Sequence, residues 1–248
     1  MAEKKLPDAI PDLSSVVTQN QFSRRKFFNY AGLSAATAVA FSSCKKELRG
    51  GVPAAPFAQD DPRNMPANTV NLGKGDIGIL NYAYALEQLE AAFYIKVTSS
   101  FYSGVTTKER TYLEDIRDHE IAHREFFKNV LGNKAIRPLL FDFSTINFNS
   151  RESVLGTAKA FEDLGVSAYN GAGELLESAA YLLFAGKIVS VEARHAAAIR
   201  DLINYGSFAA SDVVNAQGLD VYRTPPEVLA IAATYIDTKI IANNLPTS

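Results

Sequence analysis

With 248 residues, 47% of them hydrophobic, and a formal net charge of −2, the chain is long enough for one sizeable domain with further appended segments. The charge, together with the lack of a basic stripe interleaved with aromatic residues, gives no sign of a nucleic-acid partner. Past the N-terminal segment, no stretch is apolar over the ~20 residues that a membrane-spanning helix needs.

The N-terminal segment has the order of features expected of an export signal. Residues 23–28, Ser-Arg-Arg-Lys-Phe-Phe, resemble the twin-arginine signal, and a short alanine-rich apolar run follows at residues 31–41. That run is too short to span a bilayer. A chance basic pair before an ordinary helix is the alternative. We expect residues 1–43 to be a twin-arginine-type signal read by the twin-arginine export machinery, so that the mature protein lies in the cell envelope or periplasm.

Cys44, the only cysteine in the chain, directly follows this segment. It resembles the lipidated cysteine of a bacterial lipoprotein, which would anchor the protein to the membrane, although Phe41 stands where such signals usually carry leucine. Cleavage by ordinary signal peptidase near Ser43 would instead give a soluble periplasmic protein. Residues 44–75 are rich in Pro, Gly, Ala and Asn without periodicity, and we expect them to form a flexible tether.

From residue 76 onward the pattern is helical, and no stretch has the alternation of a strand or a hairpin. Asp76 is expected to cap the first helix, and Thr106 with Glu109 has the spacing of a capping box for the second. Pro225 and Pro226 suit the first turn of the last helix. The expected helices span about residues 76–98, 106–132, 150–170, 178–204 and 227–242.

The lengths of the connections constrain the topology. Short links join the first helix to the second and the third to the fourth, so each pair should be antiparallel. The long connection falls between the two pairs. The predicted fold is therefore all-α: an antiparallel four-helix bundle over residues 76–206 with one long crossover between helices 2 and 3, and a C-terminal extension, residues 207–248, with one helix.

Both halves of this bundle carry the same motif. A glutamate is followed seven residues later by a tyrosine, and a Glu-x-x-His lies on the next helix. The residues are Glu87, Tyr94, Glu120 and His123 in the first half and Glu162, Tyr169, Glu192 and His195 in the second. Four carboxylates and two imidazoles on four helices can hold two metal ions in a bundle core. Two divalent cations would balance four buried carboxylates, each of which is costly to bury alone.

We therefore expect the four glutamates and two histidines of the motif to be metal ligands, with Glu120 and Glu192 bridging the two ions. Carboxylate and imidazole ligands suit iron or manganese, and zinc is not excluded. Tyr94 and Tyr169 could each donate a hydrogen bond to a metal-bound carboxylate. A single Glu-x-x-His is usually a solvated pair, so a degenerate bundle without metal is the alternative.

Two further residues lie next to the motif. Glu90 competes with Glu87, because it lies one turn away on the same helix face, but it aligns with Gly165 in the second half. Glu90 could instead be an additional ligand or a surface charge. His119 lies about 100° around the helix from Glu120, and we expect it to be exposed.

These residues resemble the ferritin-like domain family, including its export-tagged bacterial branch related to plant desiccation-related proteins. The likeness is carried by residues 80–94, 120–123, 161–171 and 191–197 and extends over about residues 73–206. It implies a ferritin-like bundle with a dinuclear carboxylate site. Ferritins store iron, rubrerythrins reduce peroxide and manganese catalases dismutate it. This chain lacks the cysteines of a rubredoxin module.

The resemblance implies an exported protein with a dinuclear iron or manganese centre, active in metal oxidation or peroxide detoxification. If the protein is an enzyme, we expect a di-metal oxidoreductase of the ferroxidase, peroxidase or catalase type. The alternative is a non-catalytic stress or desiccation-related protein with a vestigial or purely structural metal site. The sequence is compatible with a homo-oligomer, although the tether disfavours a closed storage cage.

Overall fold

The computed structural model describes residue 66 and residues 68–246, which belong to one unit of the chain, residues 56–248. The expected signal at residues 1–43, Cys44 and the first part of the expected tether lie outside the described residues. Among the helices that the structure does describe, none combines the length and the apolar character needed to cross a membrane.

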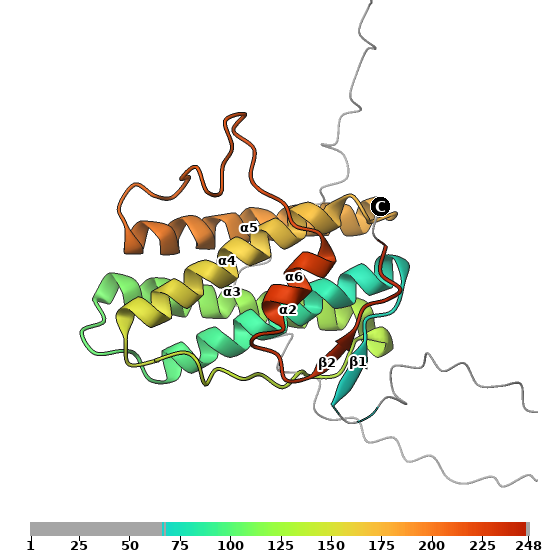
Figure 1. Cartoon of the computed structure of the whole chain (residues 1–248), viewed down its shortest axis with the longest axis horizontal. Helices are drawn as coiled ribbons and strands as arrows, with labels where there is room; N and C mark the ends of the chain where they lie inside the picture. The colour runs from blue at the N-terminus through green and yellow to red at the C-terminus, as the bar shows by residue number, and fades with distance from the viewer. Residues whose placement is uncertain (1–65, 67, 247–248) are drawn as a thin grey trace, which may run out of the picture. The chain divides into compact units, whose positions relative to one another are not determined.

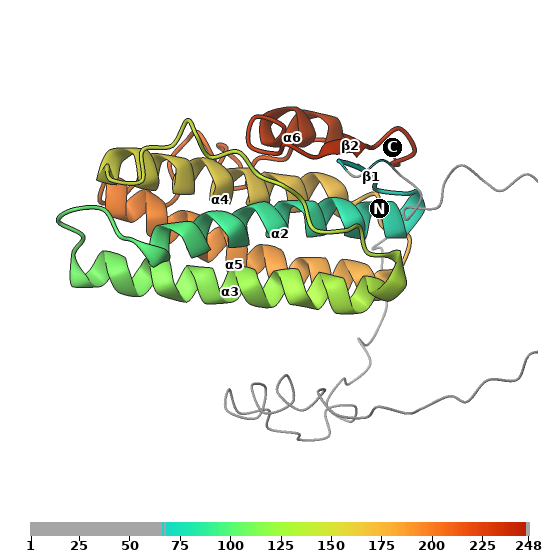
Figure 2. The ribbon, with the colours of Figure 1, turned by 90° about the horizontal axis from the view of Figure 1, so that it is seen from below.

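Four long antiparallel helices form the bundle (Figure 1). Helices α2 (Gly75–Ser99) and α3 (Thr107–Leu131) make the first pair, and α4 (Arg151–Gly173) and α5 (Ala179–Ile203) make the second. The turned view shows α2 beside α4 and α3 beside α5 (Figure 2). The predicted all-α bundle, with its long crossover between the second and third bundle helices, is confirmed.

Side-chain caps mark the starts of three of these helices. Thr106 and Glu109 form the predicted capping box, in which the Thr106 hydroxyl accepts from the Glu109 N–H and the Glu109 carboxylate accepts from the Thr106 N–H. At the starts of α4 and α5, the hydroxyl groups of Ser150 and Ser178 accept hydrogen bonds from the N–H groups of Ser153 and Tyr181. These caps satisfy N–H groups that a helix leaves unpaired at its start.

The prediction that Asp76 caps the first helix is wrong. Helix α2 begins one residue earlier, with Lys74 at the N-cap position and no side-chain cap. The Asp76 carboxylate instead accepts hydrogen bonds from the backbone N–H groups of Glu177 and Ser178, at the start of α5. Because the starts of α2 and α5 lie at the same end of the bundle, an acidic side chain on one helix can stabilise the positive end of the other.

Helix α2 is buried around most of its circumference, because the other helices, the crossover and the C-terminal extension surround it. The crossover begins with the short 3₁₀ helix η3 (Gly132–Lys134) and is held to α2 by two polar side chains. Asn81 donates to the Lys134 carbonyl and accepts from Ile136 N–H, and Gln88 accepts from the Leu139 N–H. These bonds satisfy backbone groups of an irregular segment that lies against the core.

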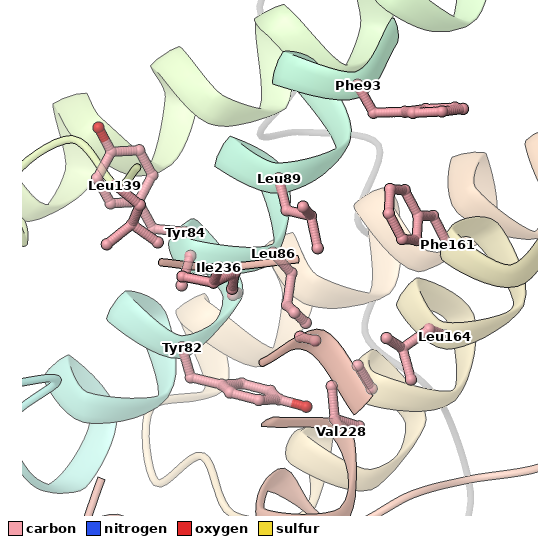
Figure 3. Close-up of a cluster of buried hydrophobic side chains, with 14 of the residues drawn as sticks. Tyr82, Tyr84, Leu86, Leu89, Phe93, Leu139, Phe161, Leu164, Val228 and Ile236 are labelled. Atoms are coloured by element: carbon pink, nitrogen blue, oxygen red, sulfur yellow. The ribbon is translucent and has the colours of Figure 1, made fainter. Parts of the chain in front are cut away.

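Apolar side chains of α2 and α4 meet those of the C-terminal extension in the cluster shown in Figure 3. Leu86 of α2 lies near Leu164 of α4, with Val228 of the extension beside them, and Phe93 of α2 lies near Phe161 of α4. The rings of Phe93 and Phe161 pack edge to face with centroids 5.1 Å apart. The extension is thus part of the core and covers the α2–α4 face.

The prediction of a helix over residues 227–242 is only partly right. Helix α6 (Pro225–Ala232) has the expected prolines in its first turn but ends early. The chain then turns, and β2 (Lys239–Ile241) pairs in parallel with β1 (Thr69–Asn71), a stretch that the sequence reading placed in the tether. Strands of three residues are too short to show alternation, so the pattern of the sequence did not reveal them.

Candidate metal centre

The six predicted ligands lie together in the middle of the bundle. One glutamate comes from α2 and one from α4, while α3 and α5 each supply a Glu-x-x-His. The four carboxylates are fully buried, His195 is 4% exposed, and the His123 side chain is the most open at 13%.

The ligand atoms form two overlapping sets, and within each set they lie within 4.8 Å of one another. One set is Glu87, Glu120, His123 and Glu192, and the other is Glu120, Glu162, Glu192 and His195. Glu120 and Glu192 belong to both sets. Each set is completed by one further glutamate and one histidine, and this arrangement suits two neighbouring cation positions.

The atoms that converge here are close together but do not form hydrogen bonds. His123 Nδ1 lies 2.8 Å from Glu192 Oε1, and His195 Nδ1 lies 2.8 Å from Glu120 Oε1. Neither contact has the alignment of a hydrogen bond, and all four atoms are buried without a hydrogen-bond partner. Buried polar atoms in native proteins are normally satisfied. Unpaired nitrogen and oxygen atoms aimed at common points fit metal ligation.

Burial and mutual charge set the protonation of this cluster. Burial raises the pKa of Glu120 and of Glu162 above the ordinary range of a carboxyl group. Burial opposes protonation of His195, but the facing carboxylates, Glu162 first among them, outweigh it and raise its pKa to about 12. Without a cation the cluster therefore holds protons on buried groups. Metal binding would release them, because ligands bind in their deprotonated form.

Two tyrosines fix the outer carboxylates from across the bundle. The Tyr94 hydroxyl donates a hydrogen bond to Glu162, and the Tyr169 hydroxyl donates one to Glu87. Burial, followed by the neighbouring carboxylate, raises the pKa of both phenols, so both stay protonated and donate. The sequence indicated hydrogen bonds to metal-bound carboxylates. It did not reveal that the tyrosine of each half donates its hydrogen bond to the glutamate of the other half.

His119 has a role that the sequence reading missed. It is exposed, as expected, yet its Nδ1 lies 2.9 Å from Nε2 of His195, and the two rings stack with centroids 5.1 Å apart. This contact fixes the ring nitrogen of His195 that does not face the carboxylates. In the part of the chain that the structure describes, His123 has no equivalent hydrogen bond, so the two halves of the centre differ.

Glu90 is buried, at 3% exposure, and the interpretation as a surface charge is therefore wrong. Its Oε1 lies against Gly165 of α4, where a Cβ atom would approach it to 2.9 Å. The glycine thus leaves room for the glutamate, and this explains why the two positions differ between the halves. Burial, followed by repulsion from Glu120 and Glu192, raises the pKa of Glu90 well above the ordinary range.

A separate charged cluster holds the C-terminal extension beside the centre. The Arg200 guanidinium makes paired hydrogen bonds of 2.7 to 2.9 Å with the carboxylates of Asp163 and Asp212. Arg200 is 3% exposed and lies on α5, while Asp212 belongs to the loop that follows it. Planar two-pronged pairs of this kind add geometric specificity. The sequence contains no pattern that identifies them.

Comparison with known families agrees with this geometry. Residues 75–205, slightly more than half of the chain, match the model of a family described as a ferritin-like domain. The match begins at the first residue of α2 and ends just after α5, so it covers the four bundle helices and all six candidate ligands. A search of curated proteins found no match.

Proposed function

Because the chain belongs to the ferritin-like domain family, we propose that its bundle binds a dinuclear centre of iron or manganese. The observation that carries this proposal is the convergence of buried, unpaired carboxylate and imidazole atoms from four helices. Zinc would accept the same ligand types, so the preference for iron or manganese rests on the carboxylate-rich ligand set.

Each ligand has a distinct place in this proposal. The two glutamates common to both sets would bridge the ions, and each ion would take one further glutamate and one histidine. The proposed bridges are Glu120 and Glu192, and the end ligands are Glu87 with His123 and Glu162 with His195. Four carboxylates and two divalent cations are together neutral, and both imidazoles then stay uncharged.

Iron or manganese bound at this position would supply redox chemistry toward dioxygen or peroxide. The chain's own residues would bury the centre, exclude bulk water and keep the ligands in place. Tyr94 and Tyr169 would hold the end carboxylates through their hydroxyl groups, and His119 would hold the ring of His195. We propose metal oxidation or peroxide removal as the reaction class, and Glu90 as a further carboxylate within reach of the centre.

We also propose that the protein is exported by the twin-arginine route and anchored through a lipid on Cys44. The support is the order of charged, apolar and small residues before the single cysteine. Mass spectrometry of the mature protein tests this directly. A mature chain that begins elsewhere, or an unmodified Cys44, would contradict the anchor.

The reaction class is tested with the full-length protein after reconstitution with iron or with manganese. We expect ferrous-ion oxidation or hydrogen peroxide consumption, and we expect both to be lost in the double variant His123→Ala plus His195→Ala. Glu125→Ala, a partly exposed glutamate on α3, is the matched control and should keep the activity. A fully loaded wild-type protein without turnover would favour the alternative, a non-catalytic stress or desiccation-related protein.

A further inference from the structure

A narrow apolar cavity lies at one end of the bundle, about one helical turn from the metal centre. Its walls come from the start of α2, the ends of α3 and α4 and the start of α5. The surface that these walls present to the cavity is entirely apolar. Nothing in the proposed ligand set accounts for such a cavity.

The inner end of the cavity abuts residues next to the metal ligands. Leu86 lines the cavity and directly precedes Glu87, and Phe127 lines it one turn after His123. Tyr169 is also part of the wall, and its hydroxyl is bonded to Glu87. A small molecule at this end would be separated from the ligands by single side chains.

The outer end of the cavity reaches the surface between α3 and α5. Phe126 and Phe184 line it there, with ring centroids 5.2 Å apart in an edge-to-face arrangement. Phe184 is 38% exposed, whereas Leu86 and Ala172 farther in are at most 5% exposed. The cavity therefore leads from a pair of partly exposed rings toward the buried centre.

The size and polarity of the cavity limit what it can take. Its open part has room for roughly one water-sized molecule. Water or hydrogen peroxide would leave hydrogen bonds unmade there, and apolar cavities of this kind stay dry. Dioxygen has the right size and needs no hydrogen bond.

We propose that this cavity is the site through which dioxygen reaches the metal centre. This inference rests on the proposed function and adds that dioxygen, rather than peroxide, is the oxidant admitted by this route. Ferrous iron bound at both positions would supply the two electrons, and solvent the two protons, that reduce one dioxygen to hydrogen peroxide, and both ions would be left ferric.

Xenon, an apolar probe of similar size, tests the site independently of any reaction. In crystals of the metal-loaded protein under xenon pressure, we expect xenon between Phe127, Tyr169 and Ala172. Ala172→Leu should remove it, and so should Ala185→Leu, which fills the partly exposed outer end. Ala180→Leu is the control, because Ala180 is exposed outside the cavity wall. Ordered water in the cavity, or no xenon there, would overturn the proposal.

Kinetics test the role of the site. In Ala172→Leu or Ala185→Leu, the apparent KM for dioxygen in ferrous-ion oxidation should rise about tenfold, equivalent to ~1.4 kcal/mol. The rate with hydrogen peroxide as oxidant should not change, and neither should either rate in Ala180→Leu. Unchanged dependence on dioxygen in both cavity variants would overturn this inference while leaving the proposed function intact. Wild-type protein that binds two metals but reacts with neither oxidant would overturn both.

Discussion

Replacement of Glu90 by glutamine tests the electrostatics of the bundle centre. Glu90 is 3% exposed and has no hydrogen bond within the described part of the chain. Burial is the largest cause that raises its pKa, and repulsion from four neighbouring glutamates raises it further. In the folded metal-free protein, Glu90 is therefore protonated at pH values where an exposed glutamate has ionised.

The sign of the effect on stability follows from this difference. In the unfolded chain the carboxyl group ionises above about pH 4.3, whereas the folded protein keeps its proton to higher pH. The contribution of Glu90 to stability is therefore fully present below the unfolded pKa and is lost as pH rises toward the folded pKa. The loss is ~1.4 kcal/mol per pH unit. Glutamine does not titrate, so a variant with glutamine at this position does not lose this stability as pH rises.

We therefore expect metal-free Glu90→Gln to gain stability over the wild type as pH rises from 5 to 7. The gain should approach ~1.4 kcal/mol, or ~3–6 °C in Tm for a chain of this size, for each pH unit over which the folded protein keeps this proton and the unfolded chain has lost it. Thermal unfolding followed by circular dichroism in the presence of a chelator measures it. Glu125→Gln, at a partly exposed position, should show no such gain. Parallel pH profiles for the wild type and Glu90→Gln would refute the reasoning.

Five further substitutions probe separate parts of the structure. Tyr94→Phe and Tyr169→Phe should each lower metal affinity by about 10–100-fold in a chelator competition, because each removes the hydrogen bond that holds an end carboxylate; unchanged affinity would speak against that role. His119→Ala should weaken one of the two metal-binding steps in a calorimetric titration and spare the other, since its contact is made in one half only; equal weakening of both steps would contradict the asymmetry. Gly171→Ala should lower the free energy of unfolding by about 1–3 kcal/mol, because its Cβ would lie 1.9 Å from the Arg223 carbonyl oxygen. Gly156→Ala, with open space around it, should raise stability slightly in the same denaturant titration. Equal effects of the two glycine substitutions would show that the extension does not pack against α4 as described.

The sequence allowed the bundle and its topology to be predicted because both leave local signals. The helical periodicity, the capping box at Thr106 and the helix starts at Ser150 and Ser178 are each defined by residues that lie close to one another along the chain. The difference between short and long connections then fixed which helices pair. The repeated motif identified the residues that the structure brings together at the centre.

Contacts that depend on the relative position of two elements could not be predicted in this way. The tyrosines donate across the bundle, and His119 reaches His195 on another helix, because of how the helices are rotated against each other. For the same reason, the Asp76 carboxylate accepts a hydrogen bond at the start of α5 and does not cap its own helix. The β1–β2 pair joins segments far apart in the chain, and no local pattern marks it.

The most direct test of the account is the metal content of the purified, reconstituted full-length protein, measured by elemental analysis with the protein concentration determined independently. We expect two iron or manganese ions per chain, and we expect this number to fall sharply in the double variant Glu120→Ala plus Glu192→Ala, because these glutamates belong to both ligand sets. Less than one metal ion per wild-type chain, or the same content in the double variant, would contradict the proposed dinuclear centre.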